Sequence, residues 1–90
     1  MKYKVDYAMC ARADLKHLDY AIAQRIIKKI AFFAAQESPL HFAKPLKNAQ
    51  IGNYRFRIGD YRAIFDIDKK GRIQILMILR VKHRKDIYGL

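Results

Sequence analysis

The sequence predicts an α+β fold, in which an antiparallel sheet packs its aromatic face against a pair of helices. Two observations carry this prediction. Apolar residues recur at helical spacing between residues 22 and 34, and three segments after residue 53 alternate in the way typical of strands. With 90 residues, 52% of them hydrophobic, we expect one domain over residues 1–90 with a single core.

The amino-terminal part is expected to form a strand followed by a helical hairpin. Residues 3–7 alternate apolar and charged side chains, which predicts a short strand. Residues 11–18 are rich in Ala, Leu, Arg and Lys and predict a short helix. Asp19 is a suitable N-cap for a second helix, and Ser38-Pro39 limits the end of that helix. The apolar stripe of the second helix consists of Ile22, Ile26, Ile30 and Phe33.

The rest of the chain is expected to hold a loop, three strands and a short terminal turn or helix. Residues 40–52 show no sustained period and predict a loop. Gly59-Asp60 has glycine first, as a two-residue type II′ hairpin turn requires. A second turn is expected over residues 68–71, and the terminal piece over residues 83–88. The three expected strands comprise residues 54–58, 61–68 and 72–81.

The first hairpin is predicted to have two unlike faces. The turn sets Arg57 opposite Arg62, and side chains then alternate along both strands. Arg55, Arg57 and Arg62 therefore share one face. The opposite, core-facing side is expected to carry Tyr54, Phe56, Ile58, Tyr61, Ala63 and Phe65. Because like charges facing each other destabilise a sheet, the arginine face suggests an anion-binding site.

The last strand is expected to be central, because its middle is apolar on both faces. Uninterrupted alternation assigns Ile73, Ile75, Met77, Leu79 and Val81 to one face. It assigns Gln74, Leu76, Ile78, Arg80 and Lys82 to the other. On this interpretation Leu76 and Ile78 lie with Ile64 on the arginine face and remain open to a partner.

The charge balance indicates an acidic partner. Lys and Arg number 19 against eight Asp and Glu, which gives a net charge of +11. A polyanion such as nucleic acid is the first candidate, and an acidic protein is the second. A membrane surface is not favoured, since no helix sets a Trp/Phe face against a dense lysine face.

The sequence favours a cytoplasmic, reduced protein without cofactors. The amino terminus lacks the apolar core of a signal peptide, and no apolar run approaches membrane-spanning length. Cys10 is the single cysteine, so the chain cannot form an internal disulfide. No Cys/His spacing suited to a metal is present, and we expect no metal and no small-molecule cofactor.

The candidate chemistry is concentrated in basic residues beside one histidine and one tyrosine. These residues are Arg55, Arg57, Arg62, Arg80, Lys82, His83, Arg84 and Tyr88. His and Tyr can move protons, and Arg and Lys stabilise developing negative charge. RNA carries its own nucleophile, the 2′-hydroxyl, so such a set could cleave RNA without a metal. A surface that only binds phosphates or an acidic partner is the alternative, and composition alone favours it.

Two segments resemble a known family. YRFRIGDYRAIFDID and RVKHRKDIY resemble toxins of the RelE/ParE superfamily, on the RelE side, and the resemblance extends over nearly the whole chain. It implies a type II toxin–antitoxin toxin that cleaves mRNA on the ribosome and inhibits translation. The implied partners are a cognate antitoxin, the ribosome and mRNA.

The resemblance also implies residue roles. The implied catalytic residues are Arg55, Arg57, Arg62, Lys82, His83 and Tyr88. The implied RNA-binding residues are Lys47, Arg80, Arg84 and Lys85. Since arginine does not deprotonate in proteins, a base at position 55 or 57 is excluded, and His83 is the preferred proton acceptor. If His83 faces away from the arginines, Tyr88 becomes the candidate. A ParE-like gyrase inhibitor and an inactive binding member of the fold are the alternatives.

Overall fold

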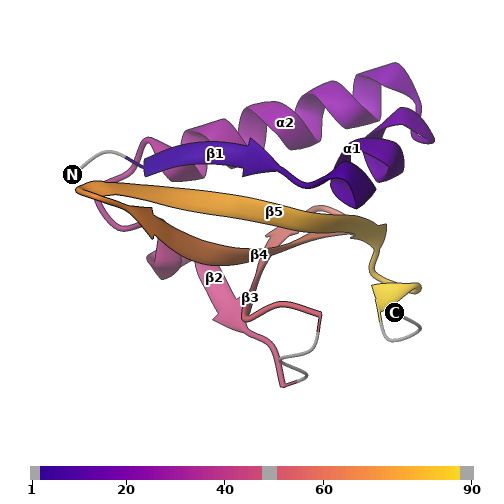
Figure 1. Cartoon of the computed structure of the whole chain (residues 1–90). Helices are drawn as coiled ribbons and strands as arrows, with labels where there is room; N and C mark the ends of the chain where they lie inside the picture. The colour runs from indigo at the N-terminus through magenta and orange to yellow at the C-terminus, as the bar shows by residue number, and fades with distance from the viewer. Residues whose placement is uncertain (1–2, 48–50, 88–90) are drawn as a thin grey trace.

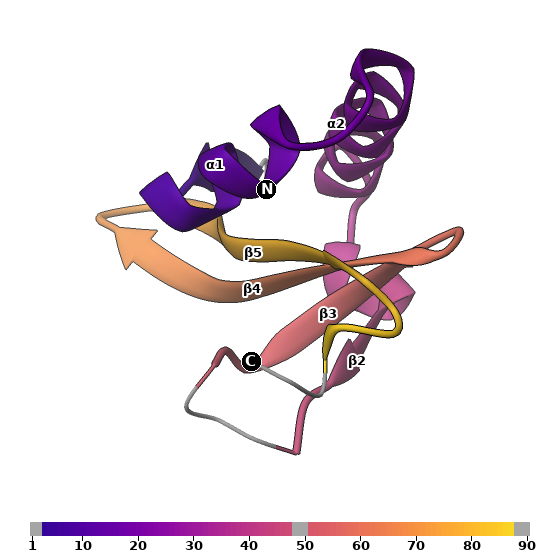
Figure 2. The same ribbon diagram turned by 90° about the vertical axis from the view of Figure 1, so that its right-hand side faces the viewer.

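The computed structural model describes residues 3–47 and 51–87, which fold into one five-stranded sheet covered on one face by two helices. Figures 1 and 2 show both helices on the same side of the sheet. The strand order is β1-β5-β4-β3-β2. The elements are β1 (Tyr3–Tyr7), α1 (Met9–Lys16), α2 (Tyr20–Ala34), a 3₁₀ helix (Pro39–Phe42), β2 (Ala43–Pro45), β3 (Tyr54–Ile58), β4 (Tyr61–Lys70) and β5 (Ile73–His83).

The predicted α+β class is confirmed, but β1 joins the otherwise antiparallel sheet as a parallel edge strand. Strands β2 to β5 pair antiparallel, whereas β1 lies parallel to β5, with Tyr3 opposite Gln74 and Tyr7 opposite Ile78. The helical hairpin after β1 carries the chain across the sheet, which makes a parallel return possible. The last strand is central, as the sequence predicted, because β1 and β4 flank it.

The first hairpin has the predicted register. Ile58 pairs with Tyr61 and Arg57 with Arg62 across β3 and β4. Gly59 has φ +59°, and Asp60 does not have a positive φ, which fits a type II′ turn. The core-facing side chains Phe56, Ile58, Ala63 and Phe65 are buried, with Tyr54 and Tyr61 packed against them.

The helices fit their predicted places closely. Helix α1 begins two residues before the predicted start and ends at Lys16, and Asp19 stands at the N-cap position of α2. The Asp19 side chain makes no capping hydrogen bond, however. In the apolar stripe of α2, Ile26, Ile30 and Phe33 are buried against the sheet, and Ile22 is partly buried.

The predicted loop over residues 40–52 was wrong in part. It contains the end of the 3₁₀ helix and the short edge strand β2, whose Lys44 lies opposite Arg55. Three residues are too few to show a strand period, and Pro45 argues against a strand by sequence, although proline is tolerated at an edge. The second turn was also misplaced: it is formed by Gly71-Arg72, with Lys70 paired to Ile73.

A β-bulge in β5 overturns the predicted faces of the strand before Leu79, whereas Lys82, the partner of Arg62, keeps its predicted place on the arginine face. Ile64 of β4 pairs with Arg80, but the next residue, Phe65, pairs with Ile78, so Leu79 is an extra residue. One extra residue reverses the alternation. Leu76 and Ile78 are consequently fully buried in the main core with Val81, and the prediction that they lie on the arginine face is wrong.

Ile64 does lie on the arginine side, but it is covered rather than open. It is fully buried, and Gly52 lies directly against it. A Cβ at residue 52 would be 2.5 Å from Ile64 Cγ2 and 3.2 Å from a Leu79 methyl group. Gly52 thus covers the apolar part of this face around Ile64, whereas the part that carries the arginines stays accessible.

Candidate functional site

The arginine cluster, defined as Arg55, Arg57 and Arg62, lies on the sheet face away from the helices, as predicted. Arg57 and Arg62 are direct partners across β3 and β4, and Arg55 follows on the same face of β3. Together with Lys44 and Phe42 the cluster lines a cavity of about 120 Å³. Among the described residues no carboxylate forms an ion pair with any of the three arginines.

Arg62 is the most constrained member of the cluster. Its Nη1 donates hydrogen bonds to the carbonyl oxygens of Gly59 at 3.0 Å and Tyr61 at 2.9 Å. Burial lowers the pKa of Arg62, and the neighbouring charges of Arg57, Arg55 and Arg84 lower it further, although Asp60 opposes them. The guanidinium stays protonated near neutral pH, so Arg62 remains a partly buried cation beside other cations, and a bound anion would relieve their mutual repulsion.

The terminal turn brings Arg84 to the same hairpin. The backbone N–H of Arg84 donates to the Asp60 carbonyl at 2.7 Å, and its Nε lies 3.8 Å from Asp60 Oδ1. Since both side chains are exposed, this ion pair contributes little energy. The backbone hydrogen bond is the contact that holds a fourth arginine beside the cluster.

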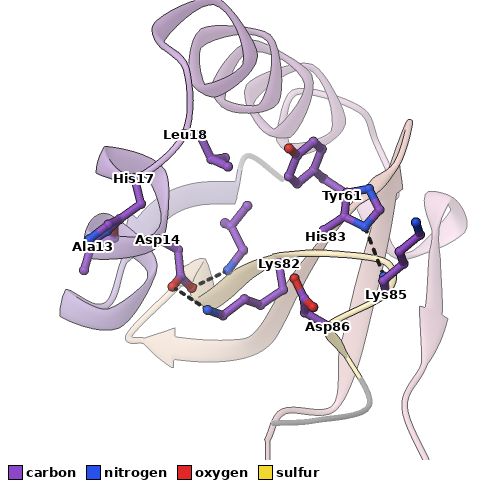
Figure 3. A pocket seen from close by; sticks show the side chains of 10 residues that line it. Ala13, Asp14, His17, Leu18, Tyr61, Lys82, His83, Lys85 and Asp86 are labelled. Atoms are coloured by element: carbon purple, nitrogen blue, oxygen red, sulfur yellow. Dashed lines mark hydrogen bonds and ion pairs between the residues drawn. The ribbon is translucent and has the colours of Figure 1, made fainter.

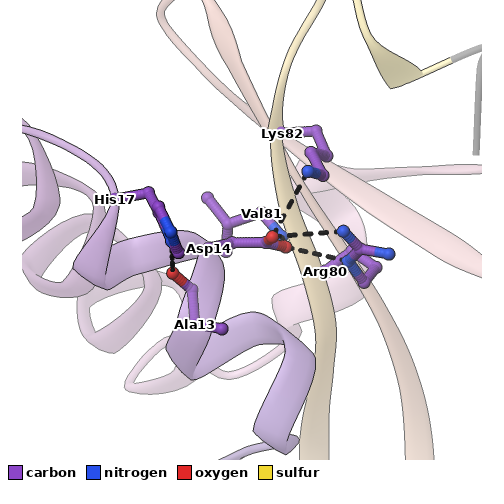
Figure 4. Close-up of polar contacts among 6 residues, drawn as sticks. All are labelled: Ala13, Asp14, His17, Arg80, Val81 and Lys82. Carbon is purple, nitrogen blue, oxygen red and sulfur yellow. Dashed lines mark hydrogen bonds and ion pairs between the residues drawn. The ribbon is translucent and has the colours of Figure 1, made fainter.

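Asp14 of α1 is an acceptor that the sequence did not single out. Its Oδ2 accepts hydrogen bonds from Arg80 Nε and from the Val81 N–H, both at 2.9 Å. Its Oδ1 accepts from Arg80 Nη2 at 3.1 Å and lies 3.4 Å from Lys82 Nζ (Figure 4). Asp14 and Arg80 are 66 positions apart, and the only signal in the sequence is one acidic residue in a basic helix.

The position of Asp14 follows from where β1 ends. Strand β1 covers β5 only as far as Ile78, whose carbonyl accepts from the Ala8 N–H. Beyond that point α1 lies beside β5, and the Asp14 carboxylate satisfies the Val81 donor in place of a strand. Burial raises the pKa of Asp14, but the hydrogen bonds from Arg80 and Val81 and the charges of Arg80 and Lys82 outweigh it and leave the pKa lowered.

His83 lies on the opposite face from the arginine cluster. It is the cross-strand partner of Tyr61, with the ring centroids 5.3 Å apart, and its Nδ1 accepts a hydrogen bond from the Lys85 N–H at 3.2 Å. Arg62, the next residue of β4, therefore points the other way. The condition set for His83 as proton acceptor is not met, and the candidate becomes Tyr88, which lies outside the described residues.

A second, larger hollow of about 670 Å³ lies between α1 and the end of β5 (Figure 3). His17, Asp14 and Leu18 line it from the helical side, and Tyr61 and His83 line it from the sheet. Of the remaining predicted RNA-binding residues, Lys85 is exposed at this hollow, and Lys47 is exposed after β2. Neither lines the cavity of the arginine cluster.

Comparison with known proteins decides the family. A model of the family described as the ParE toxin of type II toxin–antitoxin systems (parDE) matches residues 5–88. The chain belongs to this family. The toxin is 36% identical to Toxin RelG of Mycobacterium tuberculosis over 88 residues, which cover 98% of both chains. It is thus a type II toxin of the RelE/ParE superfamily, as its sequence motifs predicted.

Two solved structures with more than 30% identity share the fold of the toxin. The toxin–antitoxin complex RelBE2 of Mycobacterium tuberculosis contains a chain with a TM-score of 0.69 and 32% identity, and the match covers 93% of the toxin and all of that chain. The RelB–RelE antitoxin–toxin complex of Methanococcus jannaschii gives a TM-score of 0.59 at 32% identity, with 92% and 94% covered. No helix in residues 3–47 and 51–87 is long and apolar enough to cross a membrane.

Proposed function

We propose that the toxin is a metal-independent endoribonuclease that cleaves mRNA on the ribosome and thereby inhibits translation. The observation that carries the proposal is the arginine cluster, whose three cations line one cavity with no acidic partner among the described residues. The similarity to proteins named RelG and RelE supports the same activity, because the RelE resemblance implies cleavage of mRNA.

The proposed reaction uses a nucleophile that RNA already contains. The 2′-oxygen attacks the adjacent phosphorus, its proton passes to a base, the bond to the 5′-oxygen breaks, and that oxygen takes up a proton. Negative charge accumulates on the phosphorane oxygens, where Arg62, Arg55 and Arg57 would stabilise it. Arginine cannot take the proton from the 2′-hydroxyl, so we assign proton transfer to Tyr88.

The RNA would approach from the open side of the sheet. Arg84 adjoins the cluster through Asp60 and would bind a neighbouring phosphate. Lys47 is exposed after β2 and Lys85 is exposed at the hollow beside α1, and both would add phosphate contacts outside the cavity of the cluster. The family resemblance also implies RNA binding by Arg80 and a catalytic role for Lys82. In the free toxin, however, both side chains form ion pairs with Asp14.

A cognate antitoxin is the second proposed partner, in the cytoplasm. Two solved structures that are 32% identical to the toxin were both determined as complexes with an antitoxin. The net charge of +11 favours an acidic segment in that partner. With Leu76 and Ile78 in the core, the apolar surface that it could cover is provided by Phe32 and Phe42, which are 51% and 42% exposed.

Translation in vitro tests the proposal. Ribosomes programmed with a defined mRNA are incubated with the toxin, and primer extension locates any new 5′ ends. We expect cleavage within the codon in the ribosomal A site, unchanged when the toxin has first been dialysed against a chelator. Intact mRNA at toxin concentrations above that of the ribosomes would overturn the proposal.

Inhibition of gyrase is the second candidate function, because the description of the matched family names ParE. The two activities are separated by a supercoiling assay run beside the translation assay. Loss of supercoiling with intact mRNA would favour the gyrase inhibitor, and neither effect would favour an inactive binding member of the fold.

A further inference from the structure

The ammonium group of Lys82 points away from Arg62, although the two residues are cross-strand partners. Arg62 and Lys82 are direct partners across β4 and β5, a position in which two like charges repel. The Lys82 ammonium nevertheless turns away toward the edge of the sheet, where it lies 3.4 Å from Asp14 Oδ1. The cations that act on Arg62 are Arg57, Arg55 and Arg84, and Lys82 is not among them.

The same carboxylate holds Arg80. Both Asp14 oxygens accept from this guanidinium, at 2.9 and 3.1 Å, in the paired geometry that makes arginine–carboxylate contacts strong (Figure 4). The Asp14 side chain is only 9% exposed, and those of Arg80 and Lys82 are each 31% exposed. A phosphate that recruited either cation would have to replace a carboxylate that is already desolvated and hydrogen-bonded.

We propose that Asp14 is a positioning residue that withholds Arg80 and Lys82 from RNA, so that the arginine cluster and Arg84 make the phosphate contacts. The inference rests on the proposed function, because RNA is the ligand of that site. The Asp14 contact, which comes from α1, divides the basic residues into two sets. Arg80 and Lys82 are held by Asp14, and the arginine cluster and Arg84 are left to bind phosphate. The number of phosphates bound is then set by an acidic residue that need not touch RNA.

The salt dependence of binding measures this number. For single-stranded nucleic acid, the logarithm of the binding constant falls with the logarithm of salt by about 0.7 per phosphate contact. If Arg80, Lys82 or both were freed from Asp14 to bind phosphate, the slope should therefore become steeper by about 0.7 to 1.4. Between 50 and 200 mM salt, this amounts to an extra loss of affinity of about three- to sevenfold.

The test compares Asp14→Asn with the wild-type toxin. Asparagine keeps the shape and can still accept from the Val81 N–H, but it removes the charge that holds Arg80 and Lys82. Binding to a 2′-O-methylated RNA oligonucleotide, which cannot be cleaved, is followed by fluorescence anisotropy over a series of salt concentrations. Thermal unfolding of each variant ensures that binding is measured on folded protein.

Asp6→Asn is the matched control. It makes the same change in net charge, but Asp6 is exposed: its Oδ1 lies 4.0 Å from Arg12 Nη2 and accepts from the Tyr7 N–H at 3.0 Å, a bond that asparagine can also accept. We expect tighter binding at low salt and a steeper slope for Asp14→Asn, with the wild-type slope for Asp6→Asn. The double variant Asp14→Asn/Lys82→Met should lose about half of the increase in slope.

Equal slopes for Asp14→Asn and Asp6→Asn would overturn the inference, and so would a failure of all the proteins to bind the oligonucleotide. A merely structural role for Asp14 would lower the unfolding temperature without steepening the slope. Cleavage on programmed ribosomes is measured separately. Its absence would overturn the proposed function and leave the comparison of slopes intact.

Discussion

Arg57 and Arg62 face each other directly across the β3–β4 hairpin, and no carboxylate among the described residues pairs with either of them. A like-charged pair in this position costs about 0.2–1 kcal/mol relative to a neutral one. The backbone enforces the arrangement, since the turn at Gly59-Asp60 fixes the register. The cluster is therefore assembled before any ligand arrives, and an anion would gain from relieving an existing repulsion.

Replacing Arg62 with alanine should lower the rate of mRNA cleavage by about 10²–10³-fold, because loss of one charge-stabilising donor commonly has this effect. Single-turnover cleavage on programmed ribosomes is the measurement. Arg72→Ala is the control, since Arg72 is an exposed residue of the β4–β5 turn. A wild-type rate for Arg62→Ala, in protein with a normal unfolding temperature, would exclude the proposed site.

Replacing Tyr88 with phenylalanine should slow cleavage while leaving RNA affinity unchanged. The substitution removes only a hydroxyl, so a loss of rate without a loss of binding would identify proton transfer. His83→Asn provides the comparison, because His83 lies on the other face of the sheet and should not take part. If His83→Asn is slow and Tyr88→Phe is not, the assignment of the proton acceptor is reversed.

The contribution of Asp14 to stability should depend on pH. Its pKa in the folded toxin lies below the ordinary value of 3.8, so the carboxylate stabilises the fold above about pH 4. That stabilisation disappears as pH falls through the lowered pKa. Urea unfolding should show Asp14→Asn less stable than wild type by about 2 kcal/mol at pH 6, and the difference should shrink toward pH 2. A difference independent of pH would contradict this account.

Gly52→Ala should destabilise the toxin by roughly 1–3 kcal/mol, because the new methyl group would enter the space of Ile64 and Gly52 has φ +144°. Gly71→Ala is the comparison, since φ at Gly71 is +61° but nothing lies within 4 Å of a Cβ there. Its cost should be limited to the left-handed backbone, about 1–2 kcal/mol. Equal stability of Gly52→Ala and wild type in urea would show that the segment before β3 yields easily.

The cognate antitoxin should protect the basic face of the sheet from hydrogen exchange. Charge complementarity and the exposed Phe42 beside the arginine cluster favour contacts along β3, β4 and the end of β5. Comparison of the free and bound toxin by mass spectrometry is the measurement. Protection restricted to residues 40–47, or none anywhere, would contradict a partner that covers the cluster.

The hairpin register was predictable because local chemistry determines it. A single glycine at position 59 specifies the turn, and a two-residue turn leaves only one pairing for Arg57 and Arg62. The stripe of α2 was predictable for a similar reason: a helical period extends over enough residues to be recognised.

The β-bulge at Leu79 could not be predicted, because no residue type requires it. Uninterrupted alternation was the simplest assumption, and one extra residue invalidated it for Leu76 and Ile78. Asp14 was missed for a different reason, since its partners are 66 and 67 residues away and only the packing of α1 beside β5 brings them together. The choice between His83 and Tyr88 as proton acceptor stayed conditional, because it depended on the face that His83 takes, and only the pairing of His83 with Tyr61 decides that face.

The place of β5 in the sheet has a consequence for how the toxin is made. This strand follows the other four strands in the chain, yet it lies inside the sheet, between β4 and β1, the first strand. The core cannot close while Ile78 and Val81 are still missing, so the domain stays open until β5 has been synthesised. Pairing between such distant segments is also slow to form. A partner can thus meet this protein in the interval after β5 has been synthesised and before the sheet is assembled.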